Sequence, residues 1–235
     1  LLYSKKSISI FEKEKAYEDL YYGYSFNLDL CHRLGDSISI IAGIKQAEKL
    51  NRIREYISLT PAQRYSINAA IGHLYTMPYF TDLEKATHYY KKSIRLGSVA
   101  KDSSLVGRGL LNMGYLYNLK ENDSAIFFID RAEVHLSDRV VDLIYNYMNG
   151  SDYYEIWKQP IKGLIHIDKS IILNLKVQDT VNYISTRFEL LSAINGQQLF
   201  HCLKRKVKLL VGAYLQTKKL EYLKRSIEVS LLLEE

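Results

Sequence analysis

One pattern of small and large residues occurs twice between residues 66 and 136, and it constrains the fold more than any other feature. The first copy reads Asn68-x2-Ile71-Gly72-x2-Tyr75 and then Ala86-x3-Tyr90-x2-Ser93; the second reads Leu110-x2-Met113-Gly114-x2-Tyr117 and then Ala125-x3-Ile129-x2-Ala132. A glycine on the first helix lets the two helices of a pair cross closely, and small residues on the second helix leave room for the next pair. The pattern therefore predicts stacked pairs of helices.

The spacing resembles the signature of the tetratricopeptide repeat, in which a large residue, Leu-Gly and Tyr precede Ala, Phe and a small residue. The resemblance implies an all-α fold, an α-α superhelix (a TPR-like solenoid) of about five to six antiparallel helix pairs. It also implies a single domain over residues 1–235. The clearest repeats are 62–97 and 103–136, and degenerate repeats are expected over 12–58, 138–176 and 180–234.

Residues typical of helix starts occur between the repeats. Asp followed by Ser or Thr is expected to begin a helix at Asp36, Asp102 and Asp179, because either side chain can accept hydrogen bonds from the free amides of the first turn. Residues 60–63, Thr-Pro-Ala-Gln, form a capping box with proline at the first helical position. Pro160 is expected to begin a further helix.

Glycine-containing segments predict where helices end. Gly35 and Gly97 are each expected to stop a helix, since glycine adopts the left-handed conformation without penalty. A break is expected at residues 149–152 and a turn at 195–196, whereas one long helix is expected from about Glu12 to Leu34. No alternating run of β-branched residues predicts a strand.

The resemblance also implies where a partner binds. In this family ligands lie along the concave face of the first helices, at four positions of each repeat. The matching residues are Ser66, Ala69, His73 and Thr76 in the first clear repeat, Arg108, Leu111, Tyr115 and Asn118 in the second, and Arg139, Asp142, Asn146 and Asn149 in the degenerate third. Seven of them are predicted to bind a partner: His73, Arg108, Tyr115, Asn118, Arg139, Asn146 and Asn149. The alternative is that these residues only solvate a helical face.

Positive charge is concentrated near the C-terminal end of the chain. Residues 204–225 contain eight basic residues and one acidic residue, a local charge of +7 in a chain whose net charge is +6. The predicted basic patch comprises Lys204, Arg205, Lys208, Lys218 and Lys219. Such a cluster is suited to phosphates, an acidic partner or an anionic membrane surface, or it is a solvated face. Few aromatic residues are interleaved, so sequence-specific reading of nucleic acid is not expected.

The sequence contains few signs of a catalytic or metal-binding site. The six histidines form no i, i+4 pair, and no H-E-x-x-H, G-x-S-x-G or phosphate-binding glycine motif is present. Cys31 and Cys202 belong to no C-x-x-C pair and are expected to be small buried hydrophobes. The sequence therefore predicts no enzyme, no catalytic residue, no cofactor and no metal site.

Two uses of such a repeat array remain open. The first is a non-catalytic protein- or peptide-binding module that acts as a scaffold or adaptor. The second is a ligand- or peptide-sensing domain of a larger transcriptional regulator or signalling protein, as in bacterial regulators that resemble this chain in their degenerate repeats. The chain begins with Leu1 rather than Met, so we expect it to be a fragment or processed form.

The expected partners follow from these two uses. They are a protein or peptide, with nucleic acid contacted only through an attached domain. No apolar run reaches the roughly 18 residues that span a membrane. A cytoplasmic location is predicted, although a signal or anchor lost from either end would change it. A homo-oligomer is compatible with the sequence.

Overall fold

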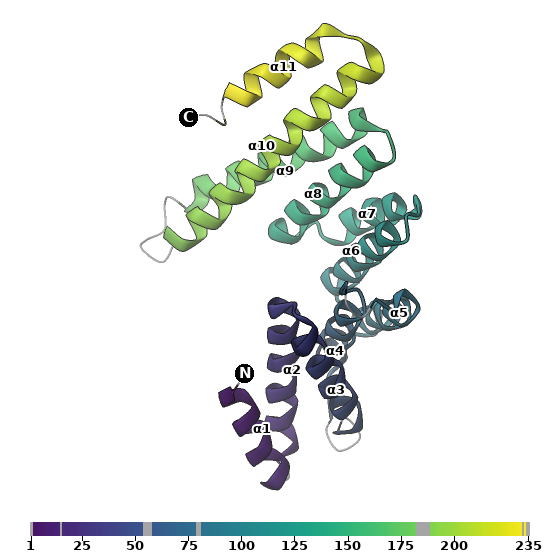
Figure 1. Ribbon diagram of the computed structural model, residues 1–235, viewed down its shortest axis with the longest axis vertical. Coiled ribbons are helices and arrows are strands. Elements are labelled where there is room, and N and C mark those ends of the chain that lie inside the picture. The colour runs from purple at the N-terminus through teal and green to yellow at the C-terminus, as the bar shows by residue number, and fades with distance from the viewer. Residues whose placement is uncertain are drawn as a thin grey trace. The chain divides into compact units, whose positions relative to one another are not determined.

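The described part of the chain is helical and contains no strand. The computed structural model describes residues 2–14, 16–53, 58–78, 81–181, 189–231 and 233. Within these ranges the helices are α1 (Leu2–Glu14), α2 (Tyr17–Leu34), α3 (Ser37–Ile53), α4 (Pro61–Leu74), α5 (Leu83–Val99), α6 (Ser103–Leu119), α7 (Ser124–His135), α8 (Val140–Ile156), α9 (Pro160–Val181), α10 (Glu189–Thr217) and α11 (Leu220–Leu231) (Figure 1). No helix among the described residues is long and apolar enough to cross a bilayer.

The helices form two compact units, and each is described separately. The first unit comprises Leu1–Lys120 with α1 to α6, and the second comprises Glu121–Glu235 with α7 to α11. A single domain over the whole chain therefore stays a prediction.

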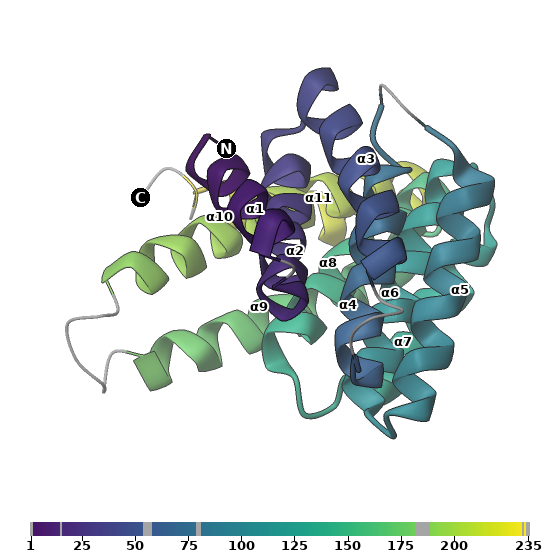
Figure 2. The ribbon, with the colours of Figure 1, turned by 90° about the horizontal axis from the view of Figure 1, so that it is seen from below.

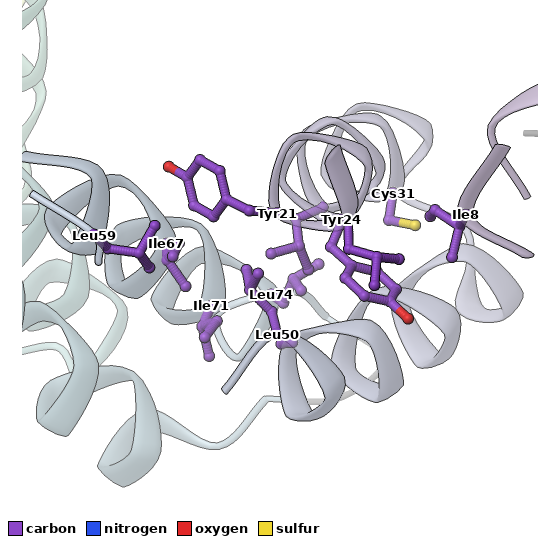
Figure 3. Close-up of a cluster of buried hydrophobic side chains, with 12 residues drawn as sticks. Ile8, Tyr21, Tyr24, Cys31, Leu50, Leu59, Ile67, Ile71 and Leu74 are labelled. Carbon is purple, nitrogen blue, oxygen red and sulfur yellow. The ribbon is translucent and has the colours of Figure 1, made fainter. Parts of the chain in front are cut away.

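In the first unit each helix packs on its neighbours in the chain. α1 packs on α2, α2 on α3, α4 on α5 and α5 on α6, and α4 also contacts α2, α3 and α6 (Figure 2). A cluster of buried side chains joins α1 to α4 (Figure 3). Its labelled members are Ile8, Tyr21, Tyr24, Cys31, Leu50, Leu59, Ile67, Ile71 and Leu74. The burial of Cys31 confirms that it acts as a small hydrophobe there.

The first of the two repeated glycines, Gly72, acts as the signature predicts. A Cβ atom on Gly72 of α4 would lie 2.5 Å from Cε1 of Tyr90 on α5, a distance that real Cβ atoms do not reach. Tyr90 is completely buried, and its hydroxyl is 2.9 Å from Nδ1 of His73. The absence of a side chain at Gly72 therefore allows the tyrosine ring to fill the crossing point.

Most predicted helix starts in the first unit are confirmed. Gly35 has φ of 66° and its N–H donates to the carbonyl of Cys31, which ends α2 in the left-handed conformation. The Asp36 carboxylate accepts from the backbone N–H of Ser39 at 2.9 Å. Both halves of the capping box at Thr60 are formed, and Asp102 accepts from the N–H of Leu105 at 3.1 Å.

Two predictions about helix ends in the first unit are wrong. The helix expected from Glu12 is instead two helices, α1 and α2, separated at Ala16, and Ile8 of α1 packs 3.1 Å from the position of a Cβ on Gly23. Gly97 does not end α5 but lies inside it, where a Cβ would be 3.0 Å from the backbone nitrogen of Val106. Gly97 allows α6 to approach closely, and no local sequence signal distinguishes a glycine with that role from one that ends a helix.

Three predicted interruptions in the second unit are also wrong. α8 runs without a break through residues 149–152, α9 continues past Asp179, and α10 continues through 195–196. Gly150 of α8 is buried, and a Cβ there would lie 2.5 Å from Nδ1 of His166 and 2.9 Å from Cγ2 of Ile129. The glycine is again a packing residue. The predicted start of α9 at Pro160 is confirmed.

The core of the second unit lies between α9, α10 and α11. Its buried members are Leu164, Ile167, Cys202, Leu209, Leu210 and Ala213. A Cβ on Gly163 would be 2.8 Å from Cδ2 of Leu209, so this glycine brings α9 close to α10. Cys202 is fully buried, as predicted. α8 packs on α7 and α9, and α10 packs on α9 and α11.

Candidate partner-binding site

The structure moves the register of the third repeat by six residues from the prediction. On α8 and α9 the signature spacing is met by Tyr147-x2-Gly150-Ser151-x2-Tyr154, followed by Gly163-x3-Ile167-x2-Ser170, with serine in the place of glycine. All seven of these residues are buried, and the Ser151 carbonyl oxygen is 3.0 Å from the position of a Cβ on Gly163. In this register, the four positions at which the family resemblance implies a ligand correspond to Tyr145, Met148, Asp152 and Glu155.

Three of these four residues line a pocket. Met148, Asp152 and Glu155 of α8 face His201, Lys204, Arg205 and Lys208 of α10 around a hollow of about 350 Å³. The fourth, Tyr145, accepts a hydrogen bond at 2.7 Å on its hydroxyl from Nε2 of Gln198, which also lies on α10. The first helices of two successive pairs thus enclose one site, which we call the α8–α10 pocket.

The charges in the α8–α10 pocket are mostly paired. The Arg205 guanidinium forms an ion pair with Asp152 and donates from Nη1 to the carbonyl of Met148 at 3.2 Å. Lys208 pairs with Glu155 at 3.0 Å. Lys204 is exposed and, among the residues that the structure describes, has no acidic partner. Three basic side chains therefore face two acidic ones, which leaves one positive charge in excess.

Asp152 is the most perturbed acid of the pocket. Its pKa is raised to about 6, chiefly by burial and in smaller part by the nearby Glu155 carboxylate, while Arg205 and Lys208 act in the opposite direction. Two-thirds of the side chain is removed from solvent, with 33 % of its surface exposed. The charged form of Asp152 is therefore disfavoured in the folded protein.

This raised pKa predicts a pH-dependent stability. Because folding raises the pKa of Asp152 from about 4 to about 6, the folded state binds its proton more tightly, and the free energy of unfolding falls as pH rises between those values. In Asp152→Asn the free energy of unfolding should fall by about 1 kcal/mol less than in the wild type as pH rises, a figure that allows for the partial exposure of Asp152. Urea unfolding at pH 4.5 and pH 7 measures the difference from wild type, and the exposed Asp138→Asn should retain the full decrease.

The predicted residues of the first unit lie on two neighbouring helices. His73 is on α4, whereas Arg108, Tyr115 and Asn118 are on α6, and these helices are in contact. Tyr115 is exposed, at 39 % of its surface, and the other three are half-buried. The His73 ring lies edge to face with that of Tyr90, with 5.4 Å between the ring centres. Its Nδ1 is 2.9 Å from the Tyr90 hydroxyl, so this nitrogen already has a hydrogen-bond partner.

The predicted residues of the third repeat do not line the pocket. Asn146 is completely buried, and its Nδ2 donates at 3.1 Å to the carbonyl of Ile129, which ties α8 to α7. It has no exposed side-chain surface for a partner. Arg139 is exposed before α8 and pairs with Asp142 at 3.4 Å, whereas Asn149 is half-buried. The register change explains why these predicted residues lie outside the α8–α10 pocket.

The predicted basic patch is divided in the structure. Lys204, Arg205 and Lys208 line the α8–α10 pocket, where two of them pair with carboxylates. Lys218 and Lys219 lie in the turn between α10 and α11 and are exposed. The patch is therefore less positive at the pocket than its sequence suggests.

Sequence reasoning missed Asp152, Glu155, Met148 and His201. The first three could have been found from the second helix of this repeat, in which Gly163, Ile167 and Ser170 have the small-large-small spacing of the signature. The first helix of the same repeat must precede that segment, which places its ligand positions between residues 145 and 155. No group of three metal-binding side chains occurs in the described ranges.

Comparison with known proteins identifies the class of fold. The chain has a tetratricopeptide-like helical repeat fold, an all-α superhelix, as predicted. A crystal structure of BtubC (BKLC) from P. vanneervenii matches 93% of this chain and 92% of its own length, with 13% identity and a TM-score of 0.55. A putative kinesin light chain from P. anserina with nearly identical TPR-like repeats matches 87% and 93%, with 7% identity and a TM-score of 0.59. No family model and no curated protein matches the sequence.

Proposed function

We propose that this protein is a non-catalytic protein- or peptide-binding module, a scaffold or adaptor that holds a partner segment against its first helices. The observation that supports the proposal is the α8–α10 pocket, three of whose lining residues lie at positions where the family resemblance implies a ligand. Its Asp152 and Glu155 can accept hydrogen bonds, and its Lys204 and Arg205 can donate them, so both sides of a peptide backbone have partners.

Exposed tyrosines on the first helices support the same proposal. Tyr115 on α6 is 39 % exposed and Tyr145 on α8 is 43 % exposed. Tyrosine supplies a large, rigid contact area with a polar end, and it is enriched where proteins bind partners. Folds of this class are typically non-enzymatic, and the charged groups of the pocket are largely paired with one another.

Site-specific crosslinking tests the proposal. A benzoyl-phenylalanine is placed at Tyr115, at Tyr145, or at Phe127, which is 54 % exposed on the second helix α7. Each variant of the chain is irradiated in native lysate at about 0.1 M and about 0.5 M salt, a range over which exposed charge pairs become strongly screened. We expect crosslinks from Tyr145 and from Tyr115, each judged for its own unit, at both salt concentrations, and none from Phe127.

The result that would overturn the proposal is equal crosslinking from all three positions, or crosslinking from Phe127 alone. A sensing role within a larger regulator would use the same face. A crosslinked small folded domain or peptide, rather than a large protein, would favour that alternative.

A further inference from the structure

We propose that two copies of this chain associate through the outer face of α11, with the two α11 helices antiparallel. The residues of this face, which we call the α11 face, stand at the first, fifth, eighth and twelfth positions of the helix and are Leu220, Lys224, Ile227 and Leu231. They fall within about 60° of one another around the helix, so they form one stripe. None of them lines the α8–α10 pocket, so such a dimer does not depend on the proposed peptide binding.

The α11 face is uncovered among the residues that the structure describes. α11 packs on α10 and on no other described helix (Figure 1). Its inward side carries the buried Ser226 and the partly buried Tyr222 and Val229, which pack toward the core of the second unit. On the outer side, the three apolar residues of the α11 face are each more than half exposed, at 56–61 % of their surface. A helix with apolar residues on both sides has a second surface to bury.

In an earlier helix pair, another helix covers the same four positions. The corresponding residues of α9 are not exposed, and they are Pro160, Leu164, Ile167 and Ile171. Two of them belong to one buried cluster with Leu209 and Leu210 of α10. On α5 the twelfth residue, Ile94, has its Cγ1 atom 2.5 Å from the position of a Cβ on Gly109 of α6. The α11 face therefore corresponds to a surface that a helix covers elsewhere in the chain.

The spacing of the α11 face makes it complementary to itself. Its residues are separated by four, three and four positions, and this order is the same in both directions along the helix. When two such helices lie antiparallel, Leu220 meets Leu231 of the second copy and Lys224 meets Ile227 of that copy. The same patch on two subunits, related by a two-fold axis, is the geometry of an isologous dimer.

The charges beside the α11 face favour the same pairing. The methylene stem of Lys224 packs on Ile227 of the second copy, which brings its ammonium group next to Glu228 of that copy. The two-fold axis forms this pair of opposite charges twice. An anionic bilayer fits less well, because the exposed Glu221 and Glu228 flank the apolar residues and are repelled by acidic lipids.

The size of the α11 face predicts a weak dimer. α11 has 12 residues, and one pair of helices of this length falls below the about 1,200 Å² that separates transient complexes from standard interfaces. We expect a dissociation constant of about 10–100 µM. Sedimentation equilibrium of the chain should therefore show mostly monomer at about 5 µM and mostly dimer at about 200 µM.

A matched pair of aspartate variants tests the surface. Ile227→Asp should weaken dimerisation by at least about tenfold, because it places a carboxylate in the middle of the interface. Ile165→Asp, at an isoleucine of α9 with nearly the same exposure (55 %), should leave dimerisation unchanged. Both side chains are exposed in the monomer, so both variants should fold, and circular dichroism checks this.

Charge reversal tests the antiparallel arrangement. In Lys224→Glu the new carboxylate faces Glu228 of the second copy, and in Glu228→Lys the new ammonium group faces Lys224. Each variant alone should dimerise about three- to tenfold more weakly than the wild type. An equimolar mixture of the two should recover the dimer, because both pairs across the interface are then of opposite charge.

Three results would overturn the proposal. The first is a chain that stays monomeric at about 200 µM; if it then sedimented with phosphatidylcholine vesicles containing about 30 % phosphatidylserine, and Ile227→Asp did not, the α11 face would be a membrane surface instead. The second is dimerisation that Ile227→Asp leaves intact, which would place the interface elsewhere. The third is dimerisation that neither charge reversal weakens, which would exclude the antiparallel pairing. Each leaves the crosslinking test at Tyr115 and Tyr145 unaffected.

Discussion

A leucine in place of Gly72 is expected to lower the free energy of unfolding by about 3 kcal/mol or more. The new side chain would begin 2.5 Å from the ring of Tyr90, which is completely buried. The α4–α5 crossing would have to open, with loss of packing on both helices. Urea unfolding followed by circular dichroism measures the change.

The control for this prediction is Ser66→Leu on the same helix. Ser66 is exposed, so an added leucine should change the free energy of unfolding by no more than about 0.5 kcal/mol. A Gly72→Leu protein that unfolds at the same urea concentration as Ser66→Leu would show that the two helices do not cross at Gly72.

A proline in place of Gly150 should destabilise the second unit by about 3 kcal/mol or more. Gly150 lies in the interior of α8, so proline would remove a helical hydrogen bond and clash with the preceding turn. A side chain there would also meet His166 and Ile129. If residues 149–152 were the turn that their composition predicts, proline would be accepted with little loss of stability. Thermal unfolding of the variant therefore tests the continuity of α8 directly.

Val140→Pro is the matched control in the same helix. Val140 is the first residue of α8 and is 39 % exposed, and proline is favoured at the first helical position because no helical partner exists there for its missing N–H. We expect a loss of less than about 1 kcal/mol. Equal destabilisation by the two prolines would mean that α8 does not begin at residue 140.

Sequence reasoning succeeded where the determining interactions are local. The starts of α3, α4 and α6 follow from Asp36, Thr60 and Asp102, since each side chain accepts from a backbone N–H three residues later. The repeat expected from residue 103 begins with α6 at Ser103, directly after its capping residue Asp102.

The same reasoning failed at glycines that contact distant segments. Gly97 and Gly150 have the composition of a helix end and a turn, yet each lies inside a helix because another helix approaches it closely. From the sequence alone, a glycine that ends a helix cannot be distinguished from a glycine that lets another helix pack closely against it. For this reason the predicted register of the third repeat, and the binding positions that depend on it, lie six residues before the register that the structure supports.

The sequence alone thus determined the all-α class, the repeated helix pair and most helix starts, because these depend on spacing and capping over a few neighbouring residues. Only the tertiary structure decided that Asp152 and Glu155 of α8 meet Arg205 and Lys208 of α10. Such a pairing depends on which faces of two helices far apart in the chain come together, and the packing of Gly150 and Gly163 against their neighbours decides those faces.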